Sequence, residues 1–240
     1  MIKIGKNISE WSAYSCQPKT RDELKEIIKD RIFKEGPNCD LNDIDISLIE
    51  DMSCLFHRMK FTGNISEWNV SNVKNMRGLF LYSNFYGDIS KWNVSNVKDM
   101  NNMFACSNFN GDISEWNISS VINMSYLFYK SKFTGNISNW NVSNVFGMEG
   151  MFYDSVFNGD ISNWNVSKVK DMNCMFYGAK FNQDISNWDV NNVTDMSYMF
   201  YKAKFNQDIS NWNVRKDCET LFAFYDCSIK EEHKPKMFQS

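Results

Sequence analysis

Apolar side chains recur along this chain with a fixed period. Seven tryptophans follow one another at intervals of 24 residues without an insertion: Trp68, Trp92, Trp116, Trp140, Trp164, Trp188 and Trp212. Trp11 lies outside the series, and Ile44 takes the tryptophan position in a partial unit that precedes Trp68. A sequence that repeats itself at a period of about 20–50 residues is typical of stacked repeat proteins. We therefore predict about eight stacked units.

The apolar positions inside one unit predict its local structure. The unit around Trp116 carries Ile113, Trp116, Ile118, Val121, Met124, Leu127 and Phe128. Trp116 and the residue two positions later share one face of an extended segment, which indicates a short strand. The later positions follow in steps of three, which suits a 3₁₀ or short helical segment. The predicted fold class is a leucine-rich-repeat-like solenoid, with one short parallel β-strand and one short helical or 3₁₀ segment in each 24-residue unit.

A stack of this kind needs its ends covered, because each end exposes core and unpaired backbone. Residues 1–42 are predicted as an N-terminal cap with a helix at about 20–35, because Thr20 and Glu23 form a capping box. An apolar stripe follows on that helix: Leu24, Ile27, Ile28 and Ile32. Residues 43–224 form the repeat domain, and residues 225–240 are predicted to be a frayed, charged tail. Upstream of the helix, residues 7–11 copy the approach to the strand of the unit that contains Trp68.

The repeated motif resembles a known family. The unit that reads FNQDISNWDV at residues 181–190 and DMSYMF at 195–200 is similar to the BspA-like leucine-rich repeat, a bacterial surface-protein repeat of about 25 residues. The resemblance covers about residues 40–224. It implies a non-enzymatic solenoid, often on cell surfaces and associated with adhesion or partner binding.

Composition excludes several classes of function. Lys and Arg number 26 against 29 Asp and Glu, so no basic excess exists for nucleic acid. No run of 18 apolar residues predicts a membrane span, and the first residues show no apolar core of a secretory signal. Seven cysteines without a paired motif favour a reducing compartment, although a bridge between Cys218 and Cys227 stays open. Cellular location is otherwise left unassigned.

Chemistry-bearing motifs are absent from the sequence. Two histidines and no nucleophile, zinc or phosphate-loop motif predict no catalytic site, no metal and no cofactor. An enzyme with its site at one of the caps is the disfavoured alternative.

Two repeated columns have a structural and a ligand-binding interpretation. The tryptophans are predicted to form core, since valine or isoleucine lies on the same side; an exposed column would instead be a stacking platform. The column four residues before each tryptophan is acidic or amide: Asn64, Asp88, Asp112, Asn136, Asp160, Asp184 and Asp208. We expect these side chains to cap their own turns, with calcium binding as the alternative.

Candidate partner-binding residues come from positions of the 24-residue unit at which the residue type changes from unit to unit, while the core positions repeat. Ile122 and Phe146 interrupt a polar column in neighbouring units, and Tyr126 lies near them in sequence. A second candidate is the tyrosine column that follows the core phenylalanine: Tyr129, Tyr153, Tyr177 and Tyr201, with Lys132, Lys180 and Lys204 three residues after three of them. The sequence therefore predicts a scaffold for protein–protein interaction. The alternative is a glycan- or host-surface-binding adhesin domain.

Overall fold

Each unit of the repeat is a succession of tight turns. In the computed structural model, which describes residues 15–239, the backbone N–H of Trp116 donates to the carbonyl of Ile113 at 3.2 Å. The same three-residue bond joins Val121 to Ile118 at 2.9 Å. Apolar residues thus stand at both ends of these two turns and face the core. The apolar spacing of three is the spacing of these turn hydrogen bonds.

The regular elements predicted inside the units are replaced by turns and bridges. Within residues 15–239 the helices are α1 (Arg21–Glu35), η2 (Glu231–His233) and η3 (Lys236–Phe238). Neighbouring units pair through isolated parallel bridges rather than strands. A 3₁₀ segment needs negative φ throughout, but Tyr126 and Lys130 have φ of 57° and 49°. The positive φ at these positions breaks the segment into separate turns. The leucine-rich-repeat-like class stays a prediction.

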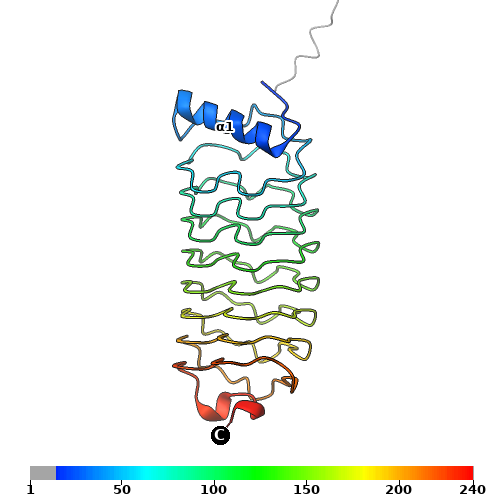
Figure 1. Cartoon of the computed structure of the whole chain (residues 1–240), viewed down its shortest axis with the longest axis vertical. Coiled ribbons are helices and arrows are strands. Elements are labelled where there is room, and N and C mark those ends of the chain that lie inside the picture. Colours follow the sequence, from blue (N-terminus) through cyan, green and yellow to red (C-terminus); the bar gives the residue numbers. More distant parts are fainter. Residues whose placement is uncertain (1–14, 240) are drawn as a thin grey trace, which may run out of the picture.

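The units lie one below another in sequence order, with α1 across one end (Figure 1). Bridges repeat at 24-residue intervals from Asp51↔Asn75 to Asp195↔Glu219. Between them runs a ladder of four backbone bonds per coil. In one coil the N–H groups of Met124, Tyr126, Phe128 and Lys130 donate to carbonyls of the next coil at 2.6–3.0 Å. This ladder fixes the register of every column of side chains.

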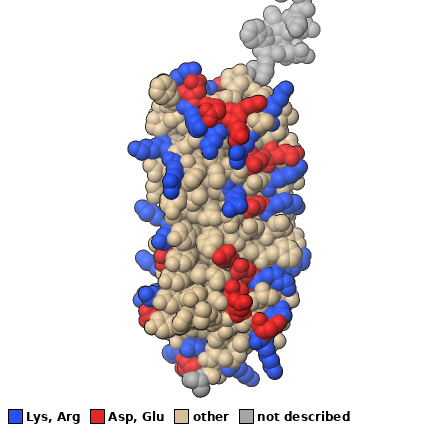
Figure 2. Space-filling view, in the orientation of Figure 1, with Lys and Arg blue, Asp and Glu red and all other residues tan. Residues whose placement is uncertain are grey.

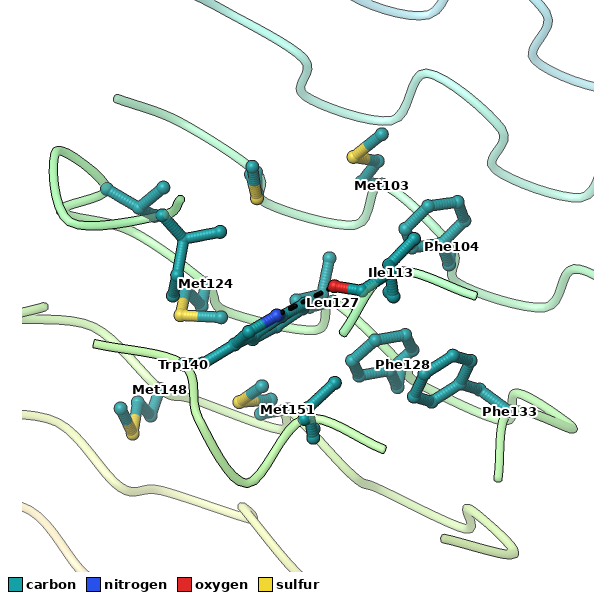
Figure 3. Close-up of a cluster of buried hydrophobic side chains, with 14 of the residues drawn as sticks. Met103, Phe104, Ile113, Met124, Leu127, Phe128, Phe133, Trp140, Met148 and Met151 are labelled. Atoms are coloured by element: carbon teal, nitrogen blue, oxygen red, sulfur yellow. Dashed lines mark hydrogen bonds between the residues drawn. The ribbon is translucent and has the colours of Figure 1, made fainter. Parts of the chain in front are cut away.

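The core is a set of aromatic and methionine columns along the stack. The seven tryptophans of the series are 3–5% exposed, so their predicted burial is confirmed. Each indole N–H donates to a carbonyl of the preceding coil; that of Trp140 reaches Ile113 at 3.0 Å (Figure 3). Phe128 stacks on Phe152 with ring centroids 5.9 Å apart, and on Phe133 at 4.4 Å. The buried polar indole atom therefore has a partner in every coil, as burial requires.

The N-terminal end is closed by α1. Thr20 Oγ1 accepts the backbone N–H of Glu23, which is one of the two bonds of the predicted capping box. The carboxylate of Glu23 accepts the N–H of Lys19 rather than that of Thr20. Leu24 and Ile28 are buried against the first coil. The sequence segment at residues 7–11, Trp11 included, lies outside the described residues.

The C-terminal segment corrects the prediction of a frayed tail. Ile229 is 8% exposed, and the N–H of Ile209 donates to the carbonyl of His233 at 3.0 Å. Phe238 of η3 packs edge-on against Phe224 with centroids 4.9 Å apart. The many charged residues of this segment suggested a solvated tail, but its few apolar residues anchor it to the last coil.

Candidate binding surface

The ladder segment of each coil presents its outward side chains on one face. Within it, the side chains of Met124, Leu127 and Phe128 are buried in the core. Tyr126 and Tyr129 are partly exposed on the outer side of the same segment. Because the backbone ladder holds neighbouring coils in register, like positions form straight columns along the stack.

One such column is a continuous stack of five tyrosine rings. Tyr129 to Tyr153, Tyr153 to Tyr177, Tyr177 to Tyr201 and Tyr201 to Tyr225 have centroid separations of 5.0, 4.3, 4.8 and 5.2 Å. The first four rings are half-buried, and Tyr225 at the end is 55% exposed. The structure therefore brings the four predicted tyrosines together and adds a fifth.

A second column extends this stack sideways. Tyr126 contacts Tyr129 at 5.9 Å, while Tyr198 contacts Tyr201 at 5.7 Å. Phe222 joins Tyr198 to Tyr225, at 5.7 and 5.5 Å. We name this surface the aromatic face; it consists of Tyr126, Tyr129, Tyr153, Tyr177, Tyr198, Tyr201, Phe222 and Tyr225. Sequence reasoning missed the last three positions that join it, namely Tyr198, Phe222 and Tyr225. The shared register of the two columns was the signal that could have found them.

Charged side chains contact the tyrosines of the aromatic face without covering it. The ammonium groups of Lys130 and Lys202 lie 5.3 Å from the ring centroids of Tyr129 and Tyr201. The phenol of Tyr126 donates to the carboxylate of Glu149. Burial, then this hydrogen bond, raises the pKa of Tyr126. Burial likewise raises the pKa of Tyr153, so both phenols are neutral at physiological pH.

A hollow opens on the aromatic face. It has a volume of about 400 Å³ and is lined by Asn102, Tyr126, Tyr129 and Tyr153. The rings of Tyr126 and Tyr129 stand at 77° to each other, so they form two walls of a corner. Such a corner offers ring faces and phenol oxygens together, which suits a partner with mixed polar and apolar groups.

Ile122 and Phe146 form a separate apolar pair. They occupy the same position in adjacent coils, where the N–H of Phe146 donates to the carbonyl of Ile122 at 2.9 Å. Their side chains are 46% and 48% exposed. Exposed Lys98 and Lys170 follow on either side in the same column, again linked through 2.9 Å backbone bonds. The structure thus places Tyr126 with the tyrosines rather than with this pair.

The acidic and amide column caps turns, as predicted. The Oδ1 atom of each of its members accepts the backbone N–H two residues later; Asp160 accepts that of Ser162 at 2.9 Å. This bond, with the serine hydroxyl, lowers the pKa of Asp160. Asp184 and Asp208 line a hollow of about 280 Å³, but their Oδ1 atoms are also engaged in turns. One oxygen of each carboxylate is therefore already occupied.

The remaining candidates for chemistry are dispersed. All seven cysteines are free in the structure, including Cys218 and Cys227. Burial raises the pKa of each of those two thiols to about 11. Residues 15–239 contain no group of three or more His, Cys, Asp or Glu side chains placed to hold a metal ion. No helix in that range is long and apolar enough to cross a membrane.

Charge is distributed unevenly over the visible surface. Figure 2 shows charged side chains of both signs at the helical end, basic side chains along the edges of the stack, and a group of acidic side chains near the middle of its lower half, with uncharged areas between them. Uncharged surface of this extent is compatible with a binding surface.

Comparison with known proteins identifies one matching family model. It is described as Mycoplasma protein of unknown function, DUF285, and it matches residues 28–133 and 129–236 in tandem. No curated protein and no solved structure matches the chain. The two matched ranges span the stacked coils, the second half of α1 and most of the C-terminal segment.

Proposed function

The chain belongs to the DUF285 family of Mycoplasma proteins, and from that premise we propose that it is a non-enzymatic repeat scaffold that binds a protein partner through its aromatic face. The observation that carries the proposal is the stack of five tyrosine rings at 4.3–5.2 Å spacing on one side of the coils. Tyrosine is enriched at protein interfaces and among the residues that dominate binding energy.

The aromatic face is also suited to binding by its rigidity. Each ring contacts the next and stands on a backbone ladder of four bonds per coil. Little side-chain freedom is left to lose when a partner arrives, which lowers the entropic cost of association. The predicted leucine-rich-repeat-like fold class and the resemblance of the repeat to BspA-like surface proteins support the same proposal by analogy.

The test compares capture of a partner by the wild-type chain and by variants. Immobilised protein is exposed to extracts of cells that produce it, and captured proteins are identified by mass spectrometry. Tyr153→Ser combined with Tyr177→Ser should weaken binding of the specific partner by about 30-fold or more, because truncating an interface residue that contributes to binding costs about 1 kcal/mol or more, and two such losses sum to about 2 kcal/mol.

The matched control is Tyr86→Ser. Tyr86 is 66% exposed and lies outside the aromatic face, so its replacement should leave capture unchanged. The Tm of each variant is measured alongside, to separate lost binding from lost folding. Equal capture by the double variant and the wild type would refute the proposal, and selective retention of glycans on an array would favour the adhesin alternative.

A further inference from the structure

The backbone ladder has one direction along the stack. In each coil its four N–H groups point toward the following coil. The last complete set runs from Met196, Tyr198, Phe200 and Lys202 to the carbonyls of Glu219, Leu221, Ala223 and Tyr225, at 2.8–2.9 Å. The corresponding donors of the final coil are the N–H groups of Thr220, Phe222, Phe224 and Asp226. No carbonyl within residues 15–239 accepts from them.

Between Thr220 and Asp226 this edge offers donors without acceptors, and the carbonyls that accept from the following coil in other units lie outside this row, at the positions of Cys218 and Cys227. The carbonyls of Thr220, Phe222 and Phe224 already accept turn bonds, each at 3.2 Å, from Ala223, Tyr225 and Cys227. An ordinary sheet edge presents N–H and C=O groups alternately. Here the row facing outward is N–H only, so its complement must bring carbonyls and few N–H groups of its own.

The side chains beside this row are apolar where a terminal coil is normally polar. Leu221, Phe222 and Tyr225 are 57%, 49% and 55% exposed. Leu221 follows a column that is polar in the preceding units, where Asn173 and Ser197 occupy its place. Among the aromatic side chains of this edge within residues 15–239, Phe224 is the one whose ring contacts Phe238 of η3. The final coil therefore combines unpaired donors with exposed rings.

A second copy of the chain does not supply the complement. Its carbonyl-bearing end is the first coil, and α1 lies across that end (Figure 1). Lys25 of α1 donates to the carbonyl of Cys54 at 3.1 Å, and Arg21 donates to the hydroxyl of Ser53 at 3.0 Å. Two C-terminal ends facing each other would set N–H groups against N–H groups.

We infer that the edge from Thr220 to Asp226 binds a proline-rich extended segment of a protein partner. Proline carries a carbonyl and no N–H, and its polyproline II backbone leaves the carbonyls free. Proline-rich segments dock on surfaces lined by aromatic side chains, which Phe222 and Tyr225 provide here. An ordinary β-strand would bring N–H groups to the row between Thr220 and Asp226, which has no free acceptor for them. The inference deepens the proposed function, since this edge adjoins the aromatic face.

The probe is a ten-residue polyproline peptide, with a glycine–serine peptide of equal length as the matched control. Binding is followed by ¹⁵N NMR of the full chain. The amide resonances of Thr220, Phe222, Phe224 and Asp226 should shift downfield and exchange at least tenfold more slowly with polyproline, and not with glycine–serine. Phe222→Ser with Tyr225→Ser should weaken polyproline binding at least tenfold, and Tyr86→Ser should not.

Further variants and a measurement of self-association test the same inference. If the double variant no longer shows a cooperative thermal unfolding transition, Leu221→Gln is the milder variant to use. It should weaken polyproline binding at least threefold. Tyr153→Ser with Tyr177→Ser should bind polyproline like the wild type, so failure here is distinguishable from failure of the proposed function. Equal binding of both peptides, or no shift at the four amides, overturns the inference. So does concentration-dependent dimerisation in sedimentation experiments that protects the same amides, because a second copy would then be the occupant.

Discussion

The ring of Tyr126 lies directly over Gly150, the residue at the same position in the next coil. A Cβ atom added at Gly150 would be 2.3 Å from Cε1 of Tyr126 and 2.4 Å from its Cδ1. Gly150 also has a φ of 54°, in the left-handed region. The ring can lie flat only because no side chain stands beneath it, so a feature of the aromatic face depends on a glycine one coil away.

Gly150→Ala should therefore destabilise the fold by about 1–3 kcal/mol, through both the contact with the ring and the strained φ. When Tyr126→Ala removes the ring, only the strain remains, and the same glycine replacement should cost about 1 kcal/mol. A double-mutant cycle by chemical denaturation measures the coupling. Strict additivity of the two substitutions would contradict the contact.

Two phenylalanines allow the effect of the same substitution on stability to be compared between the core and the surface. Phe128 is fully buried between Phe104 and Phe152, whereas Phe146 is 48% exposed. Phe128→Ala should lower the free energy of unfolding by about 3–5 kcal/mol, since it removes apolar burial and leaves a cavity. Phe146→Ala should change it by about 0.5 kcal/mol or less. Urea denaturation of both variants measures the change in the free energy of unfolding. Similar decreases in the two variants would mean that Phe146 also packs in the core.

Much of the fold could be predicted because the repeat encodes it redundantly. The period of 24 residues and the burial of the tryptophans follow from seven equivalent positions. The helix at Arg21–Glu35 follows from local signals that need no tertiary context, namely the capping box and the stop at Gly36.

The turns could not be distinguished from a 3₁₀ segment by apolar spacing, because both place apolar residues three apart. The distinguishing feature is the positive φ at Tyr126 and Lys130. Glycines in the same columns, Gly150 and Gly178, were a usable signal of that conformation, since glycine favours it. The direction of the ladder and its unpaired donors depend on tertiary pairing, which no single unit encodes.

The tryptophans offer an optical test of the packing. Seven of them are 3–5% exposed and hydrogen-bonded through the indole N–H to the preceding coil. In a Trp11→Phe background, emission should be blue-shifted and should resist quenching by iodide, because a charged quencher does not enter a close-packed core. Unfolding in urea should restore free quenching. Efficient quenching of the folded protein would show that the indoles reach solvent.

The capped turns predict how stability depends on acid. The backbone N–H groups of Ser90 and Ser162 lower the pKa of Asp88 and Asp160 below the ordinary value of 3.8. A carboxylate whose pKa is lowered by folding stabilises the fold above that ordinary value, and the contribution is lost as pH falls through the lowered pKa. Asparagine, which serves at position 136 of the same column, accepts the same bond and does not titrate.

Asp88→Asn with Asp160→Asn should leave stability at pH 6 within about 0.5 kcal/mol of the wild type. Between pH 6 and pH 2.5 the double variant should lose less stability than the wild type, because two acid-sensitive contacts have been removed. The converse substitution, Asn136→Asp, adds one such contact and should lose more. Thermal unfolding at a series of pH values measures all three proteins. The same acid sensitivity in all of them would mean that these carboxylates contribute nothing to the pH dependence of the fold.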